Sequence, residues 1–356
     1  MKYEMAKRET ETLNAAISLH YRDLLPPSAK MRSESILLAA CCAAVSAKDP
    51  ASTVLNEWPM IMVHDAATTY LQGGLLHQIN DWAKTQPDGG AQGELNCGAR
   101  GFDWRPSLQS DGTMKMHHGS VTIDHEMGSS LDEMVAWAAA NGTAAADLVV
   151  LGITDCDGSG CAAAAQALLA ARNITYVTEC AELKGLTVGA AFAKAALPGG
   201  GAILATFDCW QENYDPAVAC SGFGSTAPAR AAALRDGGGS SGEDALEYTC
   251  YSDSSTRSFP VGRMQAYIKK TVAAGPPADG QLYTTQCIWQ ESAASVTVGE
   301  LHGSSLLADE SRSGLNALVR GMVADGSIGN TSKINFLEVN NVCDGGPQLL
   351  ATLRAI

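Results

Sequence analysis

Eight short apolar runs recur along this chain, and helix-like segments separate several of them. Such a run, bounded by turn residues, is typical of a strand that is buried on both faces of a parallel sheet. Strands that alternate with helices predict an α/β fold, and eight strands favour a (β/α)8-type barrel. The runs are Trp58–His64, Ala99–Trp104, Met114–His118, Leu148–Ile153, Ile174–Val177, Ala202–Phe207, Leu282–Ile288 and Ile334–Val339.

Five of the intervening segments suit helices, because alanine and leucine have high helix propensity. Residues 215–259 instead show no clear periodicity and contain a run of glycine and serine, which is typical of a long surface excursion. We therefore expect one barrel domain over residues 48–356, with an insertion near 215–259. The expected helices are Ser130–Ala140, Cys161–Arg172, Ala190–Ala196, Gly262–Ala273 and Gly314–Ala324.

The first 47 residues predict export. Lys30 and Arg32 precede an apolar run, Ile36–Val45, which small residues follow up to Ala47. This is the layout of a secretory signal peptide, and the run is too short to span a bilayer. The alternative is a buried alanine-rich helix. We expect residues 1–47 to be an N-terminal extension with a signal peptide, and the protein to be secreted or to reside in the endomembrane lumen.

The cysteines agree with export. Nine of the 11 follow residue 47, and they contain no Cys-x-x-Cys pair. Disulfides in an oxidising compartment are therefore favoured over a zinc site, and the odd number leaves at least one thiol free or paired with another chain. Asn141, Asn173 and Asn330 each begin an acceptor triplet for N-glycosylation.

The charge of the chain limits its partners. The formal net charge is -14, so the average field repels phosphate backbones and anionic lipid surfaces. We expect no nucleic-acid partner, and any lipid surface to be contacted without bulk electrostatic attraction. The sequence indicates no protein partner.

Three segments carry the residues that suit phosphodiester chemistry. His64 ends the first run and Asp65 follows it, Asp103 lies near the end of the second run and Arg105 just past it, and His118 ends the third. Two imidazoles can share the duties of base and acid, a carboxylate can fix a tautomer, and a guanidinium can bind a phosphate through two hydrogen bonds. All five lie at or just past the ends of predicted strands, where barrel enzymes carry their active sites.

These segments resemble the catalytic X region of the phosphatidylinositol-specific phospholipase C family, particularly its bacterial and bacterial-like secreted members. The family motifs His-Asp-Ser-Gly-Thr, Gly-Ala-Arg-x-Phe-Asp-x-Arg and His-His-Gly correspond in order to His64–Thr68, Gly98–Arg105 and His117–Gly119. Weaker similarity extends over most of residues 55–345. The resemblance implies an irregular, partly open barrel of the TIM type.

The resemblance also implies roles for the five residues. The inositol 2-hydroxyl attacks the neighbouring phosphorus, His64 acts as general base, and His118 protonates the departing oxygen. Asp65 orients His118, Arg105 stabilises the charge that develops on the phosphate, and Asp103 belongs to the same polar cluster. His117 is expected to be structural or to face solvent, because adjacent strand residues point to opposite faces.

No metal or other cofactor is expected. In the intracellular eukaryotic branch of the family the position of Arg105 is an acidic calcium ligand, so here a fixed cation replaces the ion. The loop Asp155–Ser159 begins like a calcium loop, but its twelfth position is Gln166 rather than glutamate. We expect a tight loop there, closed by Cys156 and Cys161.

The chain departs from the family on the far side of the site. Asn340 stands where the family has an aspartate beside the general base, and Glu338 on the same strand face is an alternative partner for it. Bacterial members hold inositol with a lysine and an arginine, where this chain has Thr154 and the pair Thr206 and Asp208. The candidate substrate-binding residues are therefore Arg105, Thr154, Thr206, Asp208, Glu338 and Asn340.

The predicted function is that of a secreted phosphoric diester hydrolase, which cleaves an inositol phospholipid or a glycosyl-phosphatidylinositol (GPI)-type phosphodiester without metal and contacts membranes transiently. One alternative is a catalytically weakened barrel that binds lipid or glycan. Another is a related, metal-dependent phosphodiesterase with a different head group.

Overall fold

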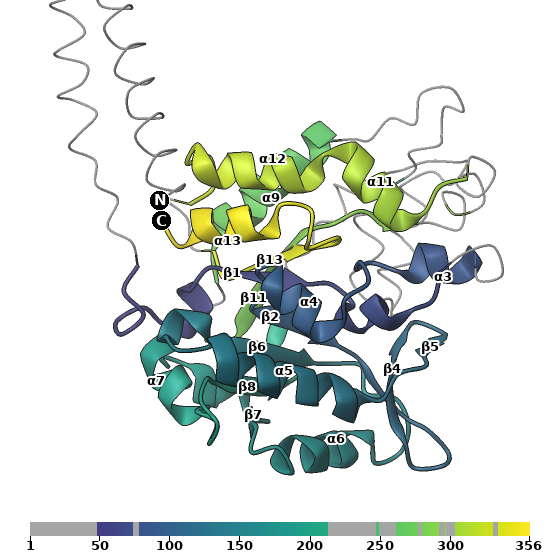
Figure 1. Cartoon of the computed structure of the whole chain (residues 1–356). Coiled ribbons are helices and arrows are strands. Elements are labelled where there is room, and N and C mark those ends of the chain that lie inside the picture. Colours follow the sequence, from purple (N-terminus) through teal and green to yellow (C-terminus); the bar gives the residue numbers. More distant parts are fainter. Residues whose placement is uncertain are drawn as a thin grey trace, which may run out of the picture. The chain divides into compact units, whose positions relative to one another are not determined.

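The computed structural model describes residues 48–73, 78–212, 247–248, 261–276, 280–291, 296, 303–329 and 334–356. The predicted signal peptide and the Asn330 triplet lie outside these residues, as does nearly all of the predicted insertion. Figure 1 shows the described part as a central sheet with helices around it. No helix within these ranges is long and apolar enough to cross a membrane.

Eight strands form one sheet, in which every pairing is parallel. Their order is β7-β8-β6-β2-β1-β13-β11-β9, and seven of them match predicted strands. No pairing among the described strands joins β7 to β9. The strands are β1 (Met60–Val63), β2 (Gly101–Trp104), β6 (Val149–Ile153), β7 (Thr175–Val177), β8 (Ile203–Phe207), β9 (Trp210–Glu212), β11 (Leu282–Cys287) and β13 (Phe336–Val339).

The eighth predicted strand, Met114–His118, forms as β4 but does not belong to the parallel sheet. It pairs antiparallel with β3 (Pro106–Leu108) and β5 (Val121–Ile123). A parallel strand needs a crossover of about a dozen residues or more, and the chain between β3 and β4 is too short for one. The eighth parallel strand is instead β9, which carries no apolar run. A further parallel pair joins β10 (Glu247–Tyr248) to β12 (Gln290–Glu291).

The five predicted helices are confirmed as α5, α6, α7, α9 and α12. In α5, buried Met127, Leu131, Met134 and Ala138 recur at helical spacing and face the core. The helices are α3 (Gln78–Ala83), α4 (Gly90–Asn96), α5 (Met127–Asn141), α6 (Cys161–Ala170), α7 (Val188–Lys194), α9 (Val261–Ala274), α11 (Leu306–Ser313), α12 (Leu315–Ala324) and α13 (Gly346–Leu353), with 3-10 turns η1 (Leu55–Glu57), η2 (Ala66–Tyr70), η3 (Ala145–Asp147) and η4 (Cys180–Leu183).

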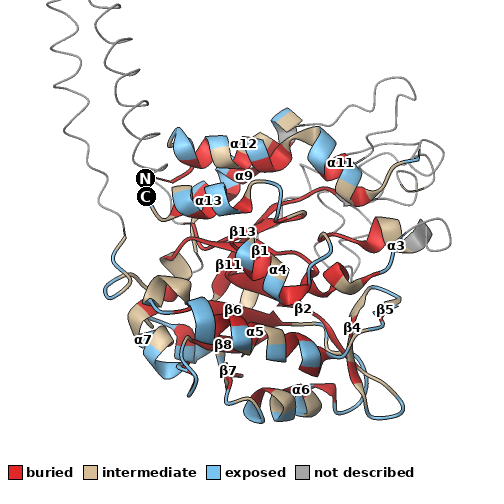
Figure 2. Cartoon of the chain, in the orientation of Figure 1, coloured by how far each residue is buried: buried red, intermediate tan, exposed pale blue. Residues whose placement is uncertain are grey.

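Apolar side chains cover both faces of the sheet, and Figure 2 shows its strands as buried. One face packs against the helices, through residues such as Ile61 and Leu151. The other face gathers residues of several strands into a second cluster, which includes Met62, Leu204 and Phe336. Because side chains alternate along a strand, the residues two positions after these also project from the second face. They are His64, Thr206 and Glu338. This places polar side chains beyond the apolar cluster, at the carboxyl ends of the strands.

The predicted disulfides are confirmed among the described residues. One of them closes the loop between Cys156 and Cys161, as expected, and Cys287 is a buried free thiol. Cys220 and Cys250 lie outside the described residues. The other two bonds are Cys97–Cys343 and Cys180–Cys209.

Candidate active site

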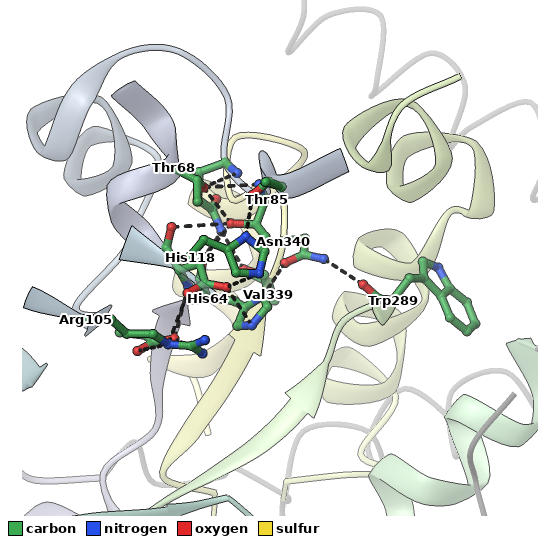
Figure 3. Close-up of polar contacts among 12 residues, drawn as sticks. His64, Thr68, Thr85, Arg105, His118, Trp289, Val339 and Asn340 are labelled. Atoms are coloured by element: carbon green, nitrogen blue, oxygen red, sulfur yellow. Dashed lines mark hydrogen bonds and ion pairs between the residues drawn. The ribbon is translucent and has the colours of Figure 1, made fainter. Parts of the chain in front are cut away.

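The candidate residues gather at the carboxyl ends of neighbouring strands. His64 directly follows β1, Asp103 lies in β2, and Asn340 directly follows β13. β1 pairs with both β2 and β13, so the topology alone brings these three positions side by side. Figure 3 shows the contacts of His64 and Asn340 together with His118, which reaches the cluster from the antiparallel β4.

His64 is held in one tautomer by Asn340. The His64 Nδ1 atom lies 3.0 Å from Asn340 Oδ1, and Asn340 Nδ2 donates to the carbonyl oxygen of Trp289 at 3.1 Å. Since a carbonyl can only accept, the amide must turn its own oxygen toward the histidine. Nδ1 of His64 therefore carries a proton, so in the neutral ring Nε2 is the atom that has the lone pair and can accept a proton.

His118 is fixed by the main chain instead. Its Nδ1–H donates to the carbonyl oxygen of Ala83 at 2.8 Å, so Nε2 is the atom left to face the site. The centroids of the His64 and His118 rings lie 6.3 Å apart, with the ring planes at 73°. The His118 side chain is 10% exposed and that of His64 only 1%, which puts His118 on the solvent side.

Asp65 lies between the two histidines. Its Oδ2 atom is 3.3 Å from His64 Nε2 and 3.2 Å from His118 Nε2, and its Oδ1 atom is 3.1 Å from Arg105 Nε. Burial by itself raises the pKa of Asp65, but Arg105, His118 and His64 outweigh it and lower the pKa to about 2. The carboxylate is therefore ionised at any physiological pH.

The backbone of Asp65 adopts a left-handed conformation, with φ 44° and ψ 49°. This turn at the end of β1 directs its N–H to Asp103 Oδ2, at 3.2 Å. Aspartate tolerates the left-handed region better than most residues, and such backbone conformations cluster at functional sites. The turn lets two consecutive residues, His64 and Asp65, both face the site.

Arg105 bridges two buried carboxylates. Its Nη2 donates to Asp103 Oδ2 at 2.8 Å, and its Nε pairs with Asp65. Burial raises the pKa of Asp103, and Arg105 opposes that rise. One guanidinium thus balances two carboxylates, in a place from which it can also meet a phosphate oxygen.

The loop between α3 and α4 holds the backbone of His64, and the sequence analysis missed it. Thr85 Oγ1 donates to the His64 carbonyl oxygen at 2.7 Å. Gln86 Nε2 donates to the same oxygen at 3.1 Å and to that of Val339 at 2.9 Å. No motif marks these residues, because their partners are main-chain atoms that are remote in sequence.

The remaining predicted substrate-binding residues are spread over the same end of the sheet. Glu338 and Thr206 are buried, and Thr206 Oγ1 donates to the Leu151 carbonyl oxygen at 3.4 Å. Thr154 is partly buried and Asp208 is exposed. Burial raises the pKa of Asp208, and the carboxylate of Asp155 raises it further. Thr154 and Asp208 are therefore more exposed than the buried Glu338 and Thr206.

Three of the buried side chains could hold a metal ion. Ligand atoms of His64, Asp103 and Glu338 all lie within 4.8 Å of one another. An imidazole and two carboxylates suit a divalent cation. Arg105 already supplies positive charge beside Asp103, which is the arrangement expected of a metal-independent site. Metal independence therefore stays a prediction.

His117 lies outside this cluster, as expected for a structural residue. Its Nδ1 atom lies 3.0 Å from the Gly119 carbonyl oxygen and its Nε2 atom 2.9 Å from that of Asp155. It ties β4 to the loop after β6. His125, another histidine outside the site, stacks on Tyr70 with ring centroids 3.6 Å apart.

Two buried glutamates make the stability of the fold depend on pH. Burial raises the pKa of Glu310 from 4.5 to about 8, and it raises that of Glu94 well above 4.5. Their contribution to the free energy of unfolding is complete below the unfolded pKa and is lost as pH rises through the folded one. We expect Tm to fall between about pH 5 and pH 8, and Glu310→Gln to flatten that decline in thermal melts. An unchanged slope in the variant would contradict this assignment.

Solved structures of bacterial phosphatidylinositol-specific phospholipases C share this fold. One of the Staphylococcus aureus enzyme, concerned with its membrane binding, is 14% identical with a TM-score of 0.54, and covers 85% of this chain and 94% of that one. A mutant of the same enzyme is 15% identical with a TM-score of 0.54, over 87% and 94%. The Listeria monocytogenes enzyme has a TM-score of 0.46 at 11% identity, over 85% and 94%.

The two Staphylococcus aureus likenesses confirm the predicted fold class, an α/β fold of the kind found in bacterial phosphatidylinositol-specific phospholipases C, to which the three motifs pointed. No family model matches the sequence, and no curated protein matches it.

Proposed function

We propose that this protein is a phospholipase C-like phosphodiesterase, in which His64 and His118 cleave an inositol phospholipid or a GPI-type phosphodiester. One observation carries the proposal. The Nε2 atoms of both histidines lie within 3.3 Å of the same Asp65 oxygen, while each Nδ1 is tied to an acceptor behind it. The Nε2 atoms of both imidazoles thus face the same position in the site, and Arg105 lies beside it.

In the proposed reaction, His64 Nε2 removes the proton of the substrate hydroxyl next to the phosphate. The hydroxyl oxygen forms a bond to phosphorus, the bond from phosphorus to the glycerol oxygen breaks, and His118 Nε2–H protonates that departing oxygen. The products are diacylglycerol and a cyclic phosphodiester. The greater exposure of His118 fits the acid, since the leaving group belongs to the lipid that extends toward solvent.

Arg105 stabilises the negative charge that develops on the non-bridging phosphate oxygens. Asp65 and Asp103 hold the guanidinium on both sides, so it is oriented before substrate arrives. Asp65 also stabilises either histidine in its protonated state, because its oxygen lies beside both Nε2 atoms. The ring that gains a proton and the ring that gives one up thus share a counter-ion.

We also propose that the protein acts outside the cytoplasm and contacts membranes only transiently. The disulfides among the described residues support an oxidising compartment. The net charge of -14 opposes lasting attachment to anionic lipid, and it argues against nucleic acid as a partner.

A product assay tests the reaction and its metal independence. Given phosphatidylinositol vesicles, the protein is expected to release diacylglycerol and cyclic inositol phosphate at the same rate with and without a chelator, because Arg105 supplies the cation. The products are separated by chromatography. If the chelator abolished turnover and magnesium or calcium restored it, the metal-dependent alternative at His64, Asp103 and Glu338 would replace this mechanism.

A second function is favoured by the residues in which this chain departs from the family. Asn340 is neutral, so the base lacks the adjacent carboxylate of the family, and Thr154 and Thr206 replace its inositol-holding cations. A barrel that binds lipid or glycan with little turnover would show this pattern. Binding of inositol lipid vesicles without release of either product would support it.

A further inference from the structure

Glu310 of α11 lies directly behind Asn340, on the side away from His64. Its Oε2 atom lies 3.5 Å from Asn340 Nδ2 and accepts from the backbone N–H of Trp289 at 3.4 Å. The side chain is buried, with 1% of the residue exposed. Burying a carboxyl group in this way costs free energy of folding unless the group forms hydrogen bonds.

The Asn340 amide has two N–H donors, and the structure gives each an acceptor. One donates to the Trp289 carbonyl oxygen at 3.1 Å and the other to Glu310 Oε2. With both donors engaged there, Asn340 Oδ1 is the atom that faces His64. The orientation of this amide decides which nitrogen of His64 is protonated.

The opposite orientation would disable the base. A flipped amide would donate its N–H to His64 Nδ1, and the histidine proton would then sit on Nε2, where the lone pair is needed. The flipped form would also turn Asn340 Oδ1 toward the Trp289 carbonyl oxygen, so the acceptors of Trp289 and Glu310 together oppose it. Without an acceptor at position 310, the present form would leave one buried amide hydrogen without its partner, and only the Trp289 carbonyl oxygen would still oppose the flip. An unsatisfied buried donor is a large penalty on the scale of such equilibria.

We infer that Glu310 is a positioning residue, which acts through Asn340 to keep His64 in the tautomer with a free Nε2. It fills part of the role that the family gives to an aspartate, from a different element of the fold. The inference rests on the proposed function for its effect on turnover, but not for its effect on the His64 ring.

The protonation of Glu310 does not remove its acceptor. Burial raises the pKa of Glu310 to about 8, so near neutral pH the group is a neutral carboxyl, whose carbonyl oxygen still accepts. A glutamine offers the same neutral carbonyl oxygen in nearly the same shape. A leucine fills a similar volume and offers no acceptor. The pair of variants therefore separates hydrogen bonding from packing.

The test is 15N-histidine NMR on the full chain, which reports the tautomer of each ring. In the wild type and in Glu310→Gln, His64 is expected to be the Nδ1–H form. In Glu310→Leu it is expected to become a mixture with the Nε2–H form. His118 is the internal control, because the Ala83 carbonyl oxygen holds its Nδ1–H independently of α11, so its signals should be the same in every variant.

Turnover gives the second readout. On phosphatidylinositol vesicles, Glu310→Leu is expected to lower kcat by about 10- to 100-fold with KM nearly unchanged, and Glu310→Gln to keep most of the activity. Glu94→Leu is the matched control, since it replaces another buried glutamate on α4 outside the site. It should leave both the kcat and the His64 signal as in the wild type.

The outcomes are distinct. If Glu310→Leu is folded and His64 keeps a single Nδ1–H tautomer, or if His64 and His118 change together, the inference is overturned. If the wild type releases no product but the tautomer of His64 shifts as expected, the positioning role holds and the proposed function fails. A Glu310→Leu chain that does not fold leaves Glu310→Gln to decide, because a tautomer mixture in that variant would contradict the role of a carbonyl acceptor.

Discussion

Replacing His64 with alanine is expected to lower kcat for phosphatidylinositol cleavage by about 10²- to 10⁴-fold, and His118→Ala should do the same. His64 supplies the lone pair that receives the hydroxyl proton, and His118 supplies the proton for the leaving oxygen. Neither Asp65 nor Arg105 can replace these functions, because the pKa of Asp65 is about 2 and a guanidinium does not give up its proton. The measurement is the initial rate of diacylglycerol release at saturating substrate.

The two substitutions should not be additive. If both rings act in one step, the double variant loses little more than either single one. His125→Ala is the control, since this histidine stacks on Tyr70 outside the site. Turnover that survived either His64→Ala or His118→Ala would refute the assignment of base and acid.

Arg105→Ala is expected to have two large effects. It removes the cation that meets the phosphate, which should lower kcat by about 10²- to 10³-fold. It also leaves Asp65 and Asp103 buried without their shared partner, which should cost about 3–5 kcal/mol of the free energy of unfolding. Urea unfolding measures the second effect and the vesicle assay the first.

Arg105→Lys separates the two effects. A lysine keeps the positive charge but cannot contact two carboxylates through a planar fork, so stability should be partly restored while kcat stays low. The acid side of the stability curve offers a further check. The lowered pKa of Asp65 contributes stability above its ordinary pKa of 3.8, and that stability is lost as pH falls toward 2. Without Arg105 this loss should begin at a higher pH.

Most strands could be predicted from the sequence, because burial on both faces requires a local run of apolar residues. A fully buried parallel strand such as Val149–Ile153 must be apolar throughout, and that shows in one dimension. The prediction that Met114–His118 belongs to the parallel sheet was wrong. This run alternates buried Met114 and Met116 with the half-buried Lys115 and His117, as in a strand with one open face. Its short connection to Pro106–Leu108 makes it turn back antiparallel.

The candidate site divides in the same way. Its five motif residues stand within short segments, so their chemistry and spacing could be read directly. The groups that orient them could not. His64 meets Asn340 across 276 positions. His118 Nδ1 contacts the carbonyl oxygen of Ala83 at the end of α3, and the His64 carbonyl oxygen accepts from Thr85 Oγ1 in the next loop. No motif distinguishes Ala83 or Thr85.

The partners of His64 and Asn340 on the far side of the site show the same limit of prediction from sequence. Glu338 was the predicted alternative to the absent aspartate, because alternate residues of one strand share a face. A ligand atom of Glu338 lies within 4.8 Å of one of His64, and the role of Glu338 toward the base stays a prediction. The amide of Asn340 also contacts a second carboxyl, that of Glu310 on α11, which no pattern in the sequence indicated.

The sequence by itself therefore determined which candidate catalytic groups the chain contains, the α/β class of its fold and the preference of its cysteines for disulfides. These follow from residue type and local period. The tertiary structure alone decided which nitrogen of His64 faces an acceptor, which carboxyl groups have shifted pKa values and which strand lies in which sheet. Those properties depend on burial and on partners distant in sequence, since a pKa or a tautomer is set by the neighbours that folding supplies.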